Sequence, residues 1–183
     1  MSELQSVIEA AYESAKTGAW DRLLSEWERA PVIAKRCSRY AKPGSAWTFL
    51  HQAAYSGHEG ACRFLIRLGA SLEATTHDGR TAADVAHGKG HRDLAERLRT
   101  ASLGRDTLWV APVDPDVLPS SNRWSEAVER TAPENLYVAY GGGLVQIPAQ
   151  STFYVDSMGR ALVGWHGTFN PPSGMDGESM LQT

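Results

Sequence analysis

The residues best suited to chemistry lie near the end of the chain, around His166 in the sequence Gly-Trp-His-Gly-Thr. A histidine between glycines, directly after an apolar strand, would lie at a strand end that is open to solvent. Its imidazole could act as a general base if a carboxylate oriented it. Asp156, Arg160 and Tyr154 belong to the preceding predicted hairpin and could approach His166. No nucleophile or oxyanion loop stands at a telling spacing, so a histidine that fixes a tight turn is the competing interpretation.

The six histidines also raise the question of a metal site. His87 and His91 are four residues apart, but glycines lie between them, so they straddle a predicted turn and do not share a helical face. Zinc sites usually need thiolates or closely paired ligands, and the chain has neither pattern. The three glycines at 141–143 are not followed by the lysine of a phosphate-binding loop, which favours a hairpin turn. We therefore expect no metal and no other cofactor.

Composition narrows the class of protein. The chain has 183 residues, 42% hydrophobic and 21% charged, which is typical of a soluble globular protein. Its net charge of −3 argues against nucleic acid as a partner, because phosphate-binding surfaces need a basic excess. Its first residues lack the pattern of a signal peptide, and no apolar run is long enough to cross a membrane. We expect a cytoplasmic protein with no membrane partner.

Two stretches repeat at an interval of 33 residues. The recurring residues are Thr48 and Thr81, Ala53 and Ala86, Gly57-His58 and Gly90-His91, and Leu65 and Leu98. This period is typical of helix–turn–helix–loop units that bury their apolar faces by stacking. We predict repeats near residues 46–78 and 79–100, preceded by a capping pair of helices over 4–16 and 19–29. Relative to the period, this capping unit carries extra residues, which fall in the segment 30–45.

These units resemble ankyrin repeats over about residues 4–100, most clearly over 46–99. The family pattern Thr-Pro-Leu-His-x-Ala at the first helix is matched by Thr48, Leu50, His51 and Ala53, and the Gly-His turn by Gly57-His58. Phe49 and Ala82 replace the proline, and Asp84 replaces the second histidine. Because proline pre-sets the first helical turn, its loss should weaken that turn. The resemblance implies that the chain binds another protein through a concave face.

After residue 104 strand signals dominate, so we predict an α+β chain with domains over 1–103 and 104–183. A β unit of this size is marginal by itself, and we expect it to share a core with the repeats or a partner chain. The predicted elements are hairpins over 136–140 with 144–147 and over 152–155 with 161–165, a strand at 108–110, and a short helix over 123–131.

The predicted function is protein binding, as an adaptor, an inhibitor or an immunity protein. Trp47 is the expected anchor, because a tryptophan at a loop tip has no core to fill. The surface should contain Ala46, Trp47, Gln52, Tyr55, Ser56, His77, Arg80 and Lys89. One alternative is an enzyme with a site around His166. Another is a homodimer in which Thr152–Val155 or Leu136–Tyr140 pairs with a second copy.

Overall fold

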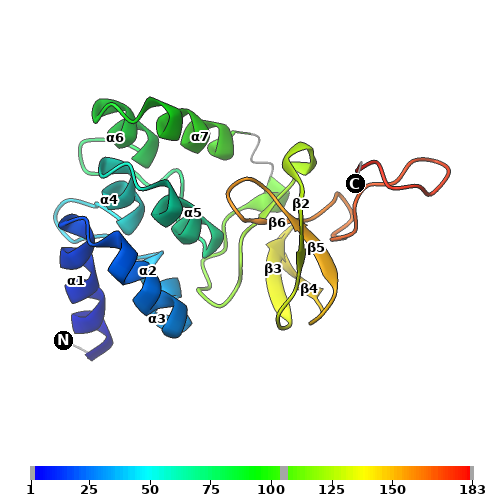
Figure 1. Ribbon diagram of the computed structural model, residues 1–183, viewed down its shortest axis with the longest axis horizontal. Coiled ribbons are helices and arrows are strands. Elements are labelled where there is room, and N and C mark those ends of the chain that lie inside the picture. Colours follow the sequence, from blue (N-terminus) through cyan, green and yellow to red (C-terminus); the bar gives the residue numbers. More distant parts are fainter. Residues whose placement is uncertain (1–2, 104–106, 182–183) are drawn as a thin grey trace. The chain divides into compact units, whose positions relative to one another are not determined.

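A computed structural model describes residues 3–103 and 107–181 of the chain. Two compact units, residues 1–104 and 105–183, make up the molecule (Figure 1). The first is helical and the second is built from strands, which confirms the α+β class. The predicted boundary at residue 104 touches residues 104–106, which lie outside the described residues. The division into domains over 1–103 and 104–183 stays a prediction.

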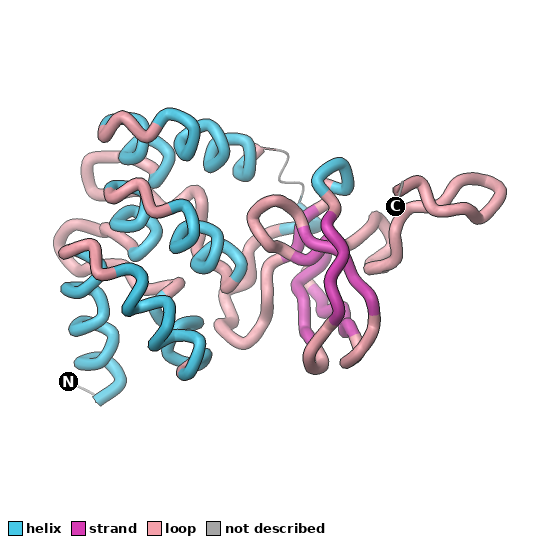
Figure 2. Tube along the Cα trace, in the orientation of Figure 1, coloured by secondary structure: helices cyan, strands magenta, loops and turns pink. Residues whose placement is uncertain are grey.

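Seven α-helices are present in the described part of the first unit (Figure 2). They are α1 (Glu3–Lys16), α2 (Trp20–Arg29), α3 (Pro31–Cys37), α4 (Phe49–Tyr55), α5 (Glu59–Arg67), α6 (Ala82–Gly88) and α7 (Arg92–Ser102). The pairs α1–α2, α4–α5 and α6–α7 confirm the predicted helix pairs. Helix α3 was not predicted. It lies where the sequence shows only extra residues, and Pro31 occupies its first turn, a position that proline favours.

The threonines of the repeat begin both first helices in the same way. Thr48 and Thr81 each accept a hydrogen bond from a backbone N–H three residues later, and that third residue accepts one from the threonine N–H. These reciprocal bonds satisfy donors that a helix start leaves unpaired. At the following turn, Gly57 has a φ of +70°, and a Cβ there would lie 2.5 Å from the His91 ring. Glycine is therefore required by both the backbone and the next repeat.

Small and aromatic side chains divide the core of the first unit. Fully buried alanines let α4 approach α5 and α6 closely; they include Ala53, Ala54, Ala61 and Ala86. Towards the N-terminus, Phe49 packs edge-on against Tyr12, Trp27 and Tyr40, with ring centroids 5.3–6.0 Å apart. The two cysteines are free and buried, and burial raises the pKa of each thiol to about 12. They are packing residues and not nucleophiles.

The second unit contains two sheets. Its strands are β1 (Ser120–Ser121), β2 (Val128–Thr131), β3 (Leu136–Tyr140), β4 (Gly143–Ile147), β5 (Thr152–Val155) and β6 (Ala161–Leu162). One sheet has the order β1-β6-β5-β2, and the other is the hairpin β3-β4. Antiparallel pairing of β3 with β4 and of β5 with β6 confirms both predicted hairpins. Among the named strands of the described residues, β1 and β6 are the pair that runs parallel.

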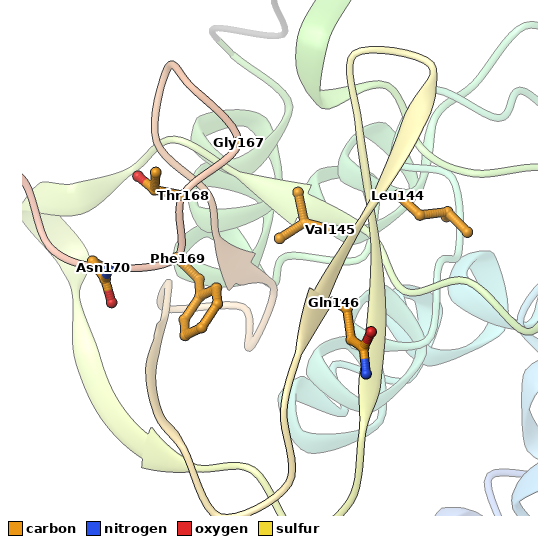
Figure 3. Close-up of a pocket in the computed structure, with 7 residues that line it drawn as sticks. All are labelled: Leu144, Val145, Gln146, Gly167, Thr168, Phe169 and Asn170. Carbon is orange, nitrogen blue, oxygen red and sulfur yellow. The ribbon is translucent and has the colours of Figure 1, made fainter.

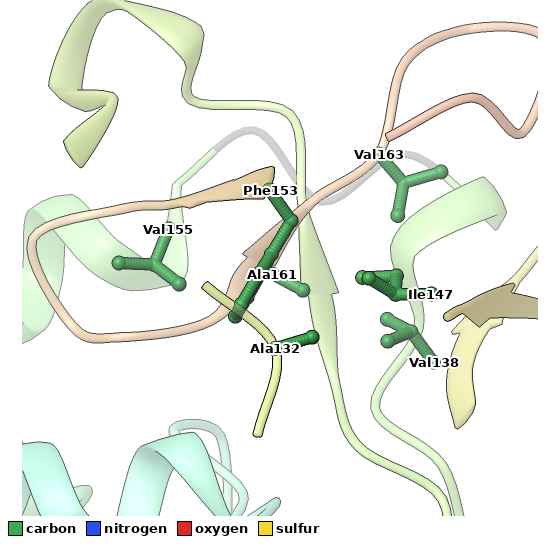
Figure 4. Packing of buried hydrophobic residues seen from close by; sticks show 7 residues of the cluster. All are labelled: Ala132, Val138, Ile147, Phe153, Val155, Ala161 and Val163. Carbon is green, nitrogen blue, oxygen red and sulfur yellow. The ribbon is translucent and has the colours of Figure 1, made fainter. Parts of the chain in front are cut away.

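The second unit has a buried hydrophobic cluster of its own (Figure 4). That it also shares a core with the repeats or with a partner chain stays a prediction. The buried cluster consists of Ala132, Val138, Ile147, Phe153, Val155, Ala161 and Val163. These residues come from both sheets and from the segments that flank them. Two layers of strands therefore bury apolar surface against each other, which a single hairpin could not do.

Two predicted elements were wrong. Residues 108–110 do not form a strand: Thr107–Trp109 is a 3₁₀ turn, and the Trp109 indole donates a hydrogen bond to the Val163 carbonyl oxygen at 3.0 Å. Residues 123–131 do not form one helix. Only Trp124–Glu126 is helical, as a 3₁₀ turn, and β2 follows it and pairs with β5. Pairing with a distant strand overrides the local apolar spacing that suggested a helix.

The strands proposed for homodimer pairing both have neighbours on two sides. Strand β5 lies between β2 and β6. Strand β3 has β4 on one side, and on the other Leu118 donates to the Tyr137 carbonyl oxygen and accepts from the Ala139 N–H. Pairing of Thr152–Val155 or Leu136–Tyr140 with a second copy would therefore have to displace these neighbours, and the homodimer stays a prediction.

Candidate functional site

Four side chains of the repeats form a continuous series of contacts, which we call the cation–aromatic row: Arg80, Trp47, Tyr55 and Lys89. The Arg80 guanidinium carbon lies 5.9 Å from the centroid of the Trp47 ring. The Trp47 and Tyr55 rings meet edge-on, with centroids 6.0 Å apart. Lys89 Nζ lies 4.1 Å above the Tyr55 ring. Each end of an aromatic pair is therefore covered by a cation, an arrangement that stabilises exposed rings.

Successive loops position the row. Arg80 stands 33 residues after Trp47, so both occupy the same position in neighbouring repeats. The Lys42 N–H donates to the Trp47 carbonyl oxygen at 2.8 Å, which closes the first loop. In the second loop, Arg80 Nε forms an ion pair with Asp78 at 2.6 Å. A backbone hydrogen bond from His77 to Ser45 joins the two loops at 3.0 Å.

A buried histidine fastens the two repeats beneath the row. His51 Nδ1 accepts a hydrogen bond from the Thr48 N–H, so its Nε2 carries the proton and donates to the Arg80 carbonyl oxygen at 3.0 Å. Burial lowers the pKa of His51 below its ordinary value, because a charged ring is poorly solvated there. His51 is therefore a structural link that needs its neutral form.

This link predicts a pH dependence. The unfolded state takes up a proton near the ordinary pKa of 6.5, whereas the folded state resists it. The stability that His51 contributes should be present above pH 6.5 and be lost as the pH falls through that value. Chemical unfolding of the wild type and of His51→Gln should differ more at about pH 7.5 than at about pH 5.5. A difference that grew on acidification would contradict the buried neutral ring.

The other predicted surface residues divide into two groups. Ala46 and His77 lie in the loops beside the row, and Ala46 has a φ of +57°. Gln52 and Ser56 are turned elsewhere: Gln52 donates to the Tyr12 hydroxyl, and the Ser56 hydroxyl accepts from the Trp20 indole, both at 2.8 Å. The structure thus brings four of the eight together through side-chain contacts and uses two as links to the capping helices.

Sequence reasoning missed two neighbours of this surface. Lys42 Nζ lies 5.2 Å from the centroid of the buried Tyr12 ring and forms an ion pair with Glu13 at 2.7 Å. Because Tyr12 is also the partner of Gln52, these residues continue the surface towards α1. The contacts join residues about 30 apart through an irregular loop, and no local signal in the sequence predicts them.

The alternative site in the second unit is not assembled. His166 is exposed, and within residues 107–181 no hydrogen bond or ion pair joins it to another side chain. Asp156 is buried and holds the Arg160 side chain at 2.8 Å. The Tyr154 hydroxyl points to Glu129 at 3.5 Å. The carboxylate that could have oriented His166 is therefore engaged in its own turn.

The described residues contain no group of three or more His, Cys, Asp or Glu side chains that could hold a metal ion. No helix in the described ranges is long and apolar enough to cross a membrane.

Comparison with known proteins bears on the repeats. A family model described as ankyrin repeats (many copies) matches residues 50–99. Residues 50–99 are ankyrin repeats. The chain is also similar to calmodulin-binding transcription activator 4 of Arabidopsis thaliana, with 34% identity over 84 residues. That match covers 43% of this chain but only 8% of the plant protein. Ankyrin repeats are protein-interaction modules in general, and three members of the row lie within residues 50–99.

Proposed function

We propose that this chain binds a partner protein through the cation–aromatic row of its ankyrin repeats. The observation that supports the proposal is the exposure of a preorganised aromatic pair. Tyr55 is 44% exposed although a cation covers its ring, and Trp47 is only half-buried at a loop tip. Large rings held in one conformation lose little entropy on binding, and such rings are enriched among residues that dominate binding energy.

The charges of the row support a partner with acidic groups. Lys89 has no ion pair among the described residues, whereas Arg80 shares its charge with Asp78. A partner carboxylate could approach Lys89 while an apolar side chain covers Tyr55. An adaptor, an inhibitor or an immunity protein would all use such a surface. A cytoplasmic location and enlargement of the surface by the β unit belong to the same proposal.

Substitutions in the row test this function. Trp47→Ala and Tyr55→Ala should each weaken partner binding at least tenfold, about 2 kcal/mol for a central aromatic residue. The measurement is quantitative affinity purification with the full chain from lysate of the source organism, followed by titration of the captured partner.

Arg97→Ala is the matched control, because Arg97 is an exposed cation on α7, away from the row, where it pairs with Glu59. It should change the affinity less than twofold. Circular dichroism of each variant verifies that the repeats remain folded. Unchanged affinity in both aromatic variants would remove the row from the interface.

A further inference from the structure

The edge of strand β4 that faces away from β3 is free, and the hairpin fixes which of its residues direct their backbone groups there. Gly141 and Gly142 have φ values of +57° and +79°, which makes the β3–β4 connection a two-residue turn closed by a hydrogen-bonded pair, Tyr140 with Gly143. Hydrogen-bonded pairs then alternate along the hairpin. The backbone groups of Tyr137 and Ala139 bond to Leu118 on the far side of β3, which agrees with this alternation of hydrogen-bonded pairs.

Two residues of β4 therefore direct their backbone groups away from β3. Leu144 and Gln146 stand opposite Ala139 and Tyr137 in the pairs that do not exchange hydrogen bonds. Their two N–H groups donate no hydrogen bond, and their two carbonyl groups accept none, within the described chain. These four groups are spaced so that one more strand could pair with them.

A groove runs beside this edge. It has a volume of about 350 Å³ and is lined by residues 144–146 of β4 and by residues 167–170 (Figure 3). The Val145 and Phe169 side chains lie between the two segments and supply its apolar surface, whereas the Leu144 and Gln146 side chains point to the other face of β4. The segment opposite β4 is held in place, because the Tyr140 hydroxyl donates to the Trp165 carbonyl oxygen and the Gly164 N–H donates to that of Thr168. The groove is therefore preformed in the protein without a ligand.

The β2 edge of the four-stranded sheet differs in chemistry. Strand β2 is exposed along its whole length and carries Glu129 and Arg130 at its centre. Charged side chains on an edge strand discourage pairing with another chain. Strand β4 has no charged residue, and none lines the groove. Of these two edges, the β4 edge alone combines unpaired backbone groups with a cavity and a neutral surface.

We propose that the β4 edge binds an extended, uncharged peptide segment of another protein as an additional strand. Backbone hydrogen bonds to Leu144 and Gln146 hold the segment. The residue opposite Val145 directs an apolar side chain into the groove against Phe169, because opposite residues of paired strands point to the same face. The neutral lining excludes a charged side chain at that position, since it would be desolvated without a partner.

A second copy of the chain fits the edge less well. In a symmetric pairing of β4 with its copy, the side chains on the groove side would be Gly143, Val145 and Ile147 of that copy. These already face the copy's own core, where Ile147 is fully buried. They cannot fill the groove. A strand of five residues also offers too little surface for a stable dimer, which usually buries about 1,200 Å² or more.

Selection of peptides with the full chain tests the proposal. The probe is a phage library of random peptides of about 10 residues, the length of a long strand. The counter-selection target is Gln146→Pro, which removes an outward N–H and leaves the pairing with β3 intact. Peptides specific to the wild type should share one apolar residue with uncharged neighbours. A synthetic peptide of that sequence should bind Gln146→Pro at least tenfold more weakly.

Thr131→Pro is the matched control, because it removes an outward N–H from the β2 edge and should leave peptide affinity unchanged. If Gln146→Pro does not fold, Thr168→Arg supplies the test, since its side chain would block the groove from an exposed position. The proposal is overturned if no peptide distinguishes the wild type from these variants. It is also overturned if light scattering shows a dimer that Gln146→Pro abolishes, because a second copy would then occupy the edge. Trp47→Ala should not change the affinity for the peptide. The proposal for the β4 edge can therefore fail independently of the proposal for the cation–aromatic row.

Discussion

Replacing Phe49 by proline, the residue that the ankyrin pattern places there, should destabilise the repeats by about 3 kcal/mol. The backbone would accept the change: Phe49 is the first residue of α4, its N–H has no hydrogen bond within the described chain, and Thr48 is extended. The loss comes from the side chain. The Phe49 ring is fully buried against Tyr12, Trp27 and Tyr40, and proline would leave most of that space empty.

Ala82→Pro is the control for this substitution, because Ala82 occupies the same position at the start of α6. Only a methyl group is replaced there, and the stability should change by no more than about 1 kcal/mol. Urea unfolding of the full chain, followed by helical circular dichroism, measures both values. Equal stability of Phe49→Pro and wild type would show that the aromatic cluster contributes little and that the lost proline matters more.

Removal of the Asp156 carboxylate should destabilise the second unit by about 3–5 kcal/mol. The side chains of Asp156 and Arg160 are 0% and 8% exposed. The carboxylate accepts hydrogen bonds from the N–H groups of Met158 and Arg160 and from Arg160 Nε. Asp156→Ala would leave a buried guanidinium without its partner and would open the turn that joins β5 to β6.

Hydrogen exchange of the β5 and β6 amides measures this effect locally. Their protection should fall strongly in Asp156→Ala and less in Asp156→Asn, whose amide oxygen can still accept the two backbone bonds. Asp116→Ala removes an exposed carboxylate from the same unit and should change protection little. Unaltered protection in Asp156→Ala would mean that the pair is not structural and would return Asp156 to the group of possible catalytic residues around His166.

These two variants address different questions about function. Phe49→Pro compares the stability gained from the proline of the ankyrin pattern with the stability gained from packing of the Phe49 ring. The second separates a structural ion pair from a catalytic one. Neither residue belongs to the cation–aromatic row or to the β4 edge, so binding at those surfaces can be measured independently of both.

Several features were determined by the sequence alone, because the chemistry that fixes them is local. Thr48 and Thr81 cap helices by bonding to residues three positions away. Gly57 ends a helix because its backbone must adopt a positive φ. Gly141 and Gly142 turn a hairpin for the same reason. A period of 33 residues then predicted the stacking of these units, and residues 50–99 match ankyrin repeats.

Part of the candidate surface was predictable for a related reason. Trp47 and Arg80 occupy equivalent positions of neighbouring repeats, so the period alone places them side by side. The side chains of Gln52 and Ser56 were not predictable, because Tyr12 and Trp20 bind them from the capping helices. A position on a helix face follows from spacing, whereas the partner of a side chain depends on which distant segment packs there.

Only the tertiary structure decided the rest of the second unit. Residues 128–131 are a strand because β5 lies beside them, although their own spacing suggested a helix. His166 is separated from Asp156 because the carboxylate pairs with Arg160 instead. Strand β4 has an edge without a strand partner, whereas β5 lies inside its sheet, because sheet order depends on pairing between segments far apart in the chain. Such pairing is a competition among all segments at once, and no local pattern records its result.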